Sequence, residues 1–304
     1  MSAAPVVVLA GGTGGAKLAR GMLDVVGPGE LVVIANTGDD IEIYGGYVSP
    51  DPDLVTFWLA DMIDERGWGL LGDTFHVMDG LRELGVEVWF NLGDRDLAIA
   101  LERSRALADG KTLTEAQAAI ATALGISARV LPMSDAPVRT RVLAAGRWWP
   151  FQEYMIRTRG AGPVTGVDLR GAAAAAPTGH VCDAIATARA IVIGPSNPVV
   201  SIGPMLAIDG LRAALADSPA PVVAVSPLVH GRVLKGPTAA FMQWAGEPLS
   251  SDGIAALYGD LIDGLVCDQR TDAVALLELD VLLDSAPARR HVAEQTLRFA
   301  LALG

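Results

Sequence analysis

The sequence predicts an α/β protein whose core is a Rossmann-like, doubly wound and mainly parallel sheet, with a helical and antiparallel β insertion. A continuous apolar run, PVVVLA (5–10), leads into a glycine-rich segment and a helix-like segment before a second apolar run, LVVIA (31–35). Similar runs return at 190–194 and 221–226, each followed by a loop rich in Gly and Pro. Uninterrupted apolar runs of this kind are typical of strands buried on both faces of a parallel sheet.

The composition is that of a folded protein and excludes several functional classes. The chain has 304 residues, of which 51% are hydrophobic and 19% charged, so it is long enough for one or two domains and too apolar for intrinsic disorder. Acidic residues outnumber basic ones by 35 to 23, which gives a net charge of −12. Because no basic stripe is present to displace counterions, we predict no nucleic-acid partner and no binding to anionic membranes.

The sequence carries neither a membrane signal nor a disulfide pattern. No apolar run reaches the roughly 18–20 residues of a spanning helix, and the N-terminal segment lacks the positive charges of a signal peptide. The two cysteines, Cys182 and Cys267, are far apart and form neither a disulfide framework nor a zinc pattern. We therefore predict a soluble, cytoplasmic protein with no membrane partner, and a homodimer as the commonest closed assembly.

The middle of the chain has a different pattern from its two ends. Helical periodicity marks four segments, which are 53–65, 73–85, 94–109 and 114–124. Residues 138–157 then alternate like a β-hairpin, and 164–171 adds an extended piece. These segments predict the helical and antiparallel insertion.

The end of the chain returns to the pattern of its beginning. A further strand is expected at 263–268 and a closing helix at 286–303. We therefore predict a Rossmann-like nucleotide-binding core made of residues 1–70 and 175–304. The insertion, residues 71–174, is expected to cover the carboxyl edge of the sheet and an active-site cleft there.

The segment GGTGGAK (11–17) directly follows the first predicted strand and opens the first predicted helix. In this position free backbone N–H groups face an anion, and glycines let a diphosphate approach the backbone. It is not a P-loop, because Lys17 is followed by Leu18, and Lys17 also replaces the third glycine of a dinucleotide-binding motif. We predict that a phosphate or nucleotide binds here, and the alternative is a purely structural turn. The residues assigned to this site are Gly11, Gly12, Thr13, Gly14, Gly15 and Lys17.

The segment after the second predicted strand, 36–57, holds a dense group of polar and acidic residues. They are Asn36, Thr37, Asp39, Asp40, Glu42, Asp51 and Asp53. Loops at this end of parallel strands line the ligand crevice, and acids there would repel a diphosphate unless a cation intervened. Carboxylate oxygens together with phosphates suit Mg²⁺, so we predict a Mg²⁺ site. The alternative is helix capping, with Asp53 capping a helix that begins at Leu54.

Two later loops also carry candidate site residues. In GPSNPVVSIGP (194–204), Ser196 and Asn197 follow a predicted strand, where they would hydrogen-bond a phosphate or a base; the alternative is a turn stiffened by proline. GDRD (93–96) begins a predicted helix, and Asp94 either has a functional role or is only the N-cap of that helix. The four histidines show no ligand spacing.

Taken in order, these motifs resemble the 2-phospho-L-lactate transferase family of coenzyme F-420 biosynthesis. The segments that carry the resemblance are GGTGGAK, NTGDDIEIYG, SPDPDLVTFWLADMID, GDTF, LGDRD, LPMSDAPVRT, GVDLRG, IGPSNPVVSIGP and AVSPLV. The resemblance implies a Mg²⁺-dependent transferase that takes a phospholactyl or phosphoenolpyruvyl group from its guanosine diphosphate carrier. The acceptor would be the 5′-hydroxyl of the deazaflavin riboside Fo, and the products GMP and (dehydro) coenzyme F-420-0.

The resemblance also implies roles for particular residues. Contacts to Fo fall on Asp53 and on Asn91, which lies just before LGDRD. The guanosine diphosphate half falls on Gly11–Gly15 and on the loop with Ser196 and Asn197.

The chemistry implied by the resemblance needs charge neutralisation and a base. Mg²⁺ would fall among Asp40, Asp51 and Asp53, and either Asp40 or Asp53 would take the proton of the attacking hydroxyl. Phosphoryl transfer of this kind depends mainly on positioning and on neutralising charge. No nucleophilic Ser-His or Cys-His pair is needed.

Two other functions stay open at this point. One is a nucleotide-sugar-binding regulatory protein of the gluconeogenesis-factor type, which has a similar glycine loop. The SPDPD and LGDRD segments favour the transferase over it. The other is an NAD(P)-dependent oxidoreductase, which is less supported because the second strand ends in Asn36 and not in an acid placed for a ribose hydroxyl.

Overall fold

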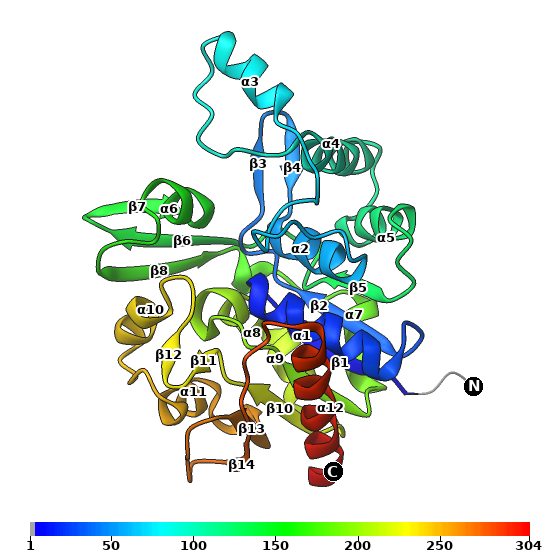
Figure 1. Ribbon diagram of the computed structural model, residues 1–304, viewed down its shortest axis with the longest axis vertical. Coiled ribbons are helices and arrows are strands. Elements are labelled where there is room, and N and C mark those ends of the chain that lie inside the picture. The colour runs from blue at the N-terminus through cyan, green and yellow to red at the C-terminus, as the bar shows by residue number, and fades with distance from the viewer. Residues whose placement is uncertain (1–3) are drawn as a thin grey trace.

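Seven parallel strands form the central sheet of the computed structural model, which describes residues 4–304 (Figure 1). The strand order is β14-β13-β10-β9-β1-β2-β5, and every neighbouring pair is parallel. The strands are β1 (Val6–Ala10), β2 (Leu31–Ala35), β5 (Arg129–Pro132), β9 (Ala190–Ile193), β10 (Val222–Val225), β13 (Gly264–Cys267) and β14 (Ala275–Glu278). Helices lie on both faces of this sheet, so the predicted doubly wound α/β class is confirmed.

The strand order reverses between β1 and β9. From β1 the sheet continues through β2 and β5 on one side, and through β9, β10, β13 and β14 on the other. Leu9 lies in register with both Ile34 and Ile193, so the loops that follow β1, β2 and β9 begin at the same edge. Ligands of open parallel sheets bind in the crevice at such a reversal.

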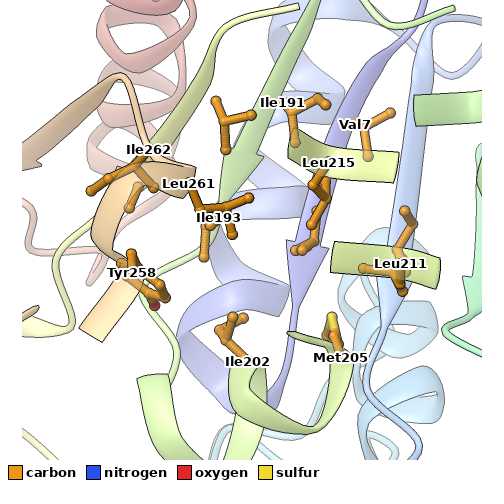
Figure 2. Packing of buried hydrophobic residues seen from close by; sticks show 14 of the residues in the cluster. Val7, Ile191, Ile193, Ile202, Met205, Leu211, Leu215, Tyr258, Leu261 and Ile262 are labelled. Carbon is orange, nitrogen blue, oxygen red and sulfur yellow. The ribbon is translucent and has the colours of Figure 1, made fainter. Parts of the chain in front are cut away.

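Residues of the central strands alternate between two clusters of apolar side chains, one on each face. Val7 and Leu9 belong to one cluster, and Val6 and Val8 to the other. The Val7 cluster is packed against α7 (Gly179–Ala186), α9 (Asp209–Ala216) and α11 (Ser251–Tyr258), as Figure 2 shows in part. The Val6 cluster is packed against α1 (Gly12–Val26), α2 (Pro50–Leu59) and α12 (Ala286–Leu303).

Two smaller units lie beside the sheet (Figure 1). The unit at the top of Figure 1 consists of β3 (Ile41–Ile43), β4 (Gly46–Val48), α3 (His76–Glu83), α4 (Asp94–Ala108) and α5 (Leu113–Ala123). The unit on the left is an antiparallel sheet of order β7-β6-β8. Its elements are β6 (Arg139–Ala144), β7 (Arg147–Pro150), α6 (Phe151–Arg157) and β8 (Val164–Arg170).

The remaining elements are short connections around the core. They are η1 (Ala172–Ala174), η2 (Pro198–Ile202), α8 (Gly203–Leu206), β11 (Leu228–Val229), β12 (Arg232–Val233), α10 (Thr238–Ala245) and η3 (Gly259–Leu261). Among residues 4–304, no single helix has the length and apolar character to cross a membrane. Only the pair Pro198–Leu206 and Asp209–Ala216, bent by 89°, meets the length and composition criteria together.

Helix α2 begins earlier than the predicted 53–65. It spans Pro50–Leu59, with Pro50 at its first position. Proline is favoured there because the N–H that it lacks has no partner inside the helix. Asp53 therefore lies within the first turn, and the expectation that it caps a helix beginning at Leu54 is wrong.

The predicted hairpin at 138–157 is only partly a hairpin. Strands β6 and β7 pair antiparallel as expected, but Phe151–Arg157 forms α6. Phe151 and Tyr154 are both buried on this helix. A spacing of three residues places them on one helical face, which the alternation of the preceding strands hides.

Two edge strands of the central sheet lie outside the predicted set. Strand β5 pairs with β2 although it falls within 71–174, the predicted insertion. Strand β14 pairs with β13 at the opposite edge. Both carry a charged residue at one end, in the sequences RVLP and ALLE, and β14 is not fully buried. Neither therefore shows the continuous apolar run of the central strands. The division into core and insertion stays a prediction, with β5 belonging to the central sheet.

A close contact between α1 and α12 gives a test of this packing. A Cβ atom added at Gly21 of α1 would lie 2.3 Å from the carbonyl oxygen of Arg289. We expect Gly21→Ala to lower the free energy of unfolding by about 1–3 kcal/mol, because the methyl group forces the helices apart. Gly29→Ala is the matched control, since nothing lies within 4 Å of its added Cβ. Urea denaturation measures both, and equal midpoints would contradict this packing.

Candidate active site

The glycine loop after β1 is hydrogen-bonded to the loop that follows β9 and to the first turn of α2. The N–H of Gly11 donates to Oγ of Ser196 (3.2 Å), and the N–H of Gly12 donates to Oδ1 of Asp51 (2.7 Å). Gly12, with φ of 64°, begins α1. The glycine loop, Ser196 and Asp51 are therefore in contact at the strand-order reversal.

The glycines of this loop differ in how much space a side chain would have. A Cβ added at Gly14 would lie 2.0 Å from the carbonyl oxygen of Pro195, and one at Gly15 would lie 2.7 Å from Oγ of Ser196. These two glycines thus allow α1 to pack closely against the loop after β9. Gly12 differs, because only Oγ of Ser201, at 4.0 Å, lies near its added Cβ. The space in front of Gly12 is open.

Two buried carboxylates share one side-chain donor beside the glycine loop. The amide of Asn36 donates to Oδ2 of Asp51 (2.9 Å) and to Oδ1 of Asp39 (3.3 Å). Burial, followed by the charge of Asp51, raises the pKa of Asp39 well above its ordinary range. Burial also raises the pKa of Asp51 to about 6, although Asn36 and the N–H of Gly12 oppose the shift. Neither carboxyl group has a cationic side chain as a partner among the described residues, and the raised pKa values favour their protonated forms.

Asp40 lies in a separate environment from Asp39 and Asp51. Its Oδ1 accepts a hydrogen bond from Oγ of Ser49 (2.7 Å), and its Oδ2 accepts one from the hydroxyl of Tyr47 (2.9 Å). Burial raises the pKa of Asp40 to about 7, and Ser49 and the charge of Arg139 are the largest opposing effects. Both carboxylate oxygens are thus already engaged by the protein.

Asp53 is held by a buried arginine that the sequence analysis leaves unassigned. The guanidinium of Arg103 is fully buried and donates to both carboxylate oxygens of Asp53. Arg103 also donates to the carbonyl oxygen of Tyr47 (3.0 Å) and to Oε1 of Gln117 (3.2 Å). Burial raises the pKa of Asp53, and Arg103 opposes that shift.

A sequence signal for this arginine exists in the spacing of α4. Leu97, Ala100, Arg103 and Ala106 recur every three residues, and all four are buried. A charged residue on an otherwise apolar helical face is uncommon unless it has a buried partner. Arg103 could therefore have been selected from the sequence as one half of an ion pair, although not the identity of its partner.

The structure does not gather the three predicted metal ligands, Asp40, Asp51 and Asp53, into one cluster. In the described part of the chain, one group of three His, Cys or acidic residues has ligand atoms within 4.8 Å of one another. That group is His230, Asp268 and Asp280, and it contains none of the predicted ligands. The carboxylate that accompanies Asp51 is Asp39.

Several other predicted site residues have structural contacts of their own. Lys17 lies over the ring of Trp58, with Nζ 5.7 Å from the ring centre. Asn197 accepts hydrogen bonds from the N–H groups of Val199 and Val200 at the start of η2.

Thr37 and Asn91 differ in whether their side chains have hydrogen-bond partners. Thr37 is buried, and its hydroxyl has no hydrogen-bond partner among residues 4–304. The side-chain oxygen of Asn91 accepts a hydrogen bond from Arg82 (2.6 Å) between α3 and α4. No hydrogen bond within the described residues joins Asn91 to the glycine loop or to Asp53.

Comparison with known proteins agrees with the predicted resemblance. The sequence profile described as 2-phospho-L-lactate transferase CofD matches residues 6–295. The chain belongs to this family. It is therefore a transferase of the 2-phospho-L-lactate transferase family, and the resemblance predicted from the motifs is confirmed.

Curated relatives of the chain match over nearly their whole length. A 2-phospho-L-lactate transferase of Methanosarcina mazei is 38% identical over 298 residues, covering 95% of this chain and 98% of the relative. A phosphoenolpyruvate transferase of Kitasatospora aureofaciens is 42% identical over 282 residues, covering 90% and 88%. A crystal structure of a UPF0052 family member from Bacillus halodurans has a TM-score of 0.60 at 17% identity, covering 98% of this chain and 99% of that one. The last likeness concerns the fold alone.

The Arg103–Asp53 pair gives a test of the buried charge balance. We expect Arg103→Met to lower the free energy of unfolding by about 3–5 kcal/mol, because the carboxylate of Asp53 stays buried without its cation. Adding Asp53→Leu to this variant should restore most of the loss. Arg105→Met, at an exposed position of the same helix, is the matched control and should leave the unfolding midpoint unchanged. Denaturation of all three variants measures the effect, and a stable Arg103→Met protein would contradict it.

Proposed function

We propose that this protein transfers a phospholactyl or phosphoenolpyruvyl group from a guanosine diphosphate carrier to the 5′-hydroxyl of Fo, with release of GMP. The observation that carries the proposal is the glycine loop joined to buried aspartates at the strand-order reversal, in a chain of the 2-phospho-L-lactate transferase family. The relatives from Methanosarcina mazei and Kitasatospora aureofaciens are named for the two alternative donors. Formation of coenzyme F-420-0, or its dehydro form, follows from this reaction.

The first turn of α1 supports binding of the donor diphosphate. Within residues 4–304, the N–H groups of Thr13 and Gly14, which precede the first i→i−4 bond of the helix, have no hydrogen-bond acceptor. Such free N–H groups at a helix N-terminus stabilise phosphate oxygens. Ser196, whose hydroxyl lies at Gly11, adds a polar group at the same place. We assign the diphosphate to this turn.

The donor set beside this turn fits Mg²⁺. Asp39 and Asp51 are buried, carry like charges and share only the amide of Asn36 between them. The unpartnered hydroxyl of Thr37 lies two residues from Asp39 in the chain. Carboxylates together with substrate phosphates are the ligands that Mg²⁺ prefers, so we assign Mg²⁺ to Asp39 and Asp51. When bound, Mg²⁺ supplies positive charge that offsets the diphosphate.

Asp53 is the assigned contact for the acceptor. Its carboxylate is fixed by Arg103, so its orientation is set before the substrate binds. The acceptor hydroxyl oxygen forms a bond to the distal phosphorus while the bond from that phosphorus to the GMP oxygen breaks. GMP leaves with the electron pair of that bond, and the hydroxyl proton passes to a protein base. Fixed positioning of this kind is the main protein contribution to phosphoryl transfer.

The direct test is mass spectrometry of products after incubation with Fo, Mg²⁺ and each of the two donors. We expect GMP and the mass of coenzyme F-420-0 or of its dehydro form, and the preferred donor identifies the transferred acid. Chelator should abolish the transfer and added Mg²⁺ should restore it, because Asp39 and Asp51 repel the diphosphate without a cation. No product with either donor would overturn the proposed function. Full activity in chelator would overturn only the Mg²⁺ assignment.

The glycine loop is tested by a matched pair of glycines at the two ends of α1. Gly12 and Gly27 both have positive φ, 64° and 76°, so valine strains the backbone at either position. The space at Gly12 faces the assigned diphosphate, whereas nothing lies within 4 Å of a Cβ at Gly27. We expect Gly12→Val to weaken GDP binding at least tenfold in calorimetry, and Gly27→Val to leave it unchanged. If the two variants bind GDP equally, the loop has only a structural role.

A further inference from the structure

One half-buried carboxylate, that of Asp96, has an oxygen that the described fold leaves unpaired. Asp96 is the third residue of α4, and its Oδ1 is buried without a hydrogen-bond partner among residues 4–304. An unpaired buried carboxylate oxygen is costly and is therefore uncommon outside functional sites.

The two neighbouring aspartates differ from Asp96, because both cap helices. Asp94 accepts hydrogen bonds from the N–H groups of His76 and Val77, so it caps α3 and not the helix that it begins. Asp73 accepts hydrogen bonds from the N–H groups of Arg95 (3.0 Å) and Asp96 (3.2 Å) and so caps α4. The expectation that Asp94 only N-caps the helix that it begins is therefore wrong, because it caps α3. Neither capping contact involves Oδ1 of Asp96.

One short loop connects the surroundings of Asp96 with the glycine loop. A Cβ added at Gly67 would lie 4.0 Å from Cγ2 of Thr13, and one added at Gly69 would lie 3.4 Å from Oδ2 of Asp96. Arg66 stacks on Trp68 within this loop, with the guanidinium carbon 4.4 Å from the ring centre. The loop 66–69 therefore lies close both to Thr13, in the first turn of α1, and to the carboxylate of Asp96.

We propose that Asp96 is a catalytic residue whose free Oδ1 accepts the proton of the acceptor hydroxyl. This inference rests on the proposed function. As the hydroxyl oxygen bonds to the distal phosphorus and GMP leaves with its oxygen, the O–H proton passes to the Asp96 carboxylate. It is then released to water after the product leaves. No further reactant is needed for this balance.

Asp53 and Asp40, the other two candidate bases, have both carboxylate oxygens occupied by hydrogen bonds. Both oxygens of Asp53 accept hydrogen bonds from Arg103, and both oxygens of Asp40 accept them from Ser49 and Tyr47. A general base must offer a free oxygen within reach of the proton that it removes. This comparison favours Asp96 over the two aspartates that the family resemblance suggests for this role.

The charges around Asp96 suit it to proton transfer. Burial, then the charges of Asp53 and Asp73, raise its pKa to about 7, while the N–H of Gly93 and the charge of Arg66 oppose the shift. A base with a pKa near the working pH is the most effective in general catalysis. Folding raises this pKa from 3.8, so ionisation of Asp96 lowers the free energy of unfolding as the pH rises above that value. An amide at this position does not ionise and removes that loss of stability.

The variant Asp96→Asn tests the role without removing a contact. We expect kcat for transfer to Fo to fall by at least 100-fold, with KM for Fo and Fo affinity by fluorescence changed less than threefold. The melting temperature of the variant at pH 8 should equal or exceed that of the unmodified protein. Asp109→Asn, at the exposed end of the same helix, is the matched control and should match the unmodified protein in both respects.

Three outcomes separate the inference from the proposed function. An Asp96→Asn enzyme with kcat within threefold of the unmodified protein would overturn the inference while leaving the transferase function intact. A loss of activity that followed weakened Fo binding or a lowered melting temperature would show a structural role and would also overturn it. Absence of transfer by the unmodified protein itself would overturn the proposed function first.

Discussion

The carboxylate of Asp51 is the contact on which the geometry of this site depends. It accepts one hydrogen bond from the glycine loop at Gly12 and another from Asn36 at the end of β2. Because Asp51 lies in the first turn of α2, this one side chain joins the start of α2 to the segments that follow β1 and β2. The close approach of Gly14 and Gly15 to the loop after β9 completes the arrangement.

The acids around Asp51 are divided by their partners and therefore by their possible roles. Asp53 is neutralised by Arg103 and Asp40 is satisfied by two hydroxyl groups, so these two form a rigid frame. Asp39 and Asp51 lack a cationic partner among the described residues, and burial raises the pKa of both. A site with anion donors on one side and excess carboxylate on the other is suited to a diphosphate together with a cation.

Features that depend on neighbouring residues could be predicted from the sequence, whereas long-range partners could not. The glycine loop and the buried strands have local signatures, and the parallel sheet brings Gly12, Asn36 and Ser196 to one edge. Arg103 is separated from Asp53 by 50 residues, and no local pattern connects them. The choice of Asp39 over Asp40 beside Asp51 depends on which way the turn after Asn36 directs adjacent side chains, and composition does not encode this. Strand β5 begins with Arg129 and ends with Pro132, so it lacks the continuous apolar run that marks the central strands.

The most direct test of this charge distribution is anomalous X-ray diffraction from crystals grown with GDP and Mn²⁺ in place of Mg²⁺. An anomalous peak between the carboxylates of Asp39 and Asp51, next to the first turn of α1, is the predicted result. A peak held by Asp40 or Asp53 would contradict the division of the acids described above. So would a peak found only at His230, Asp268 and Asp280, or no peak at saturating Mn²⁺ with GDP bound.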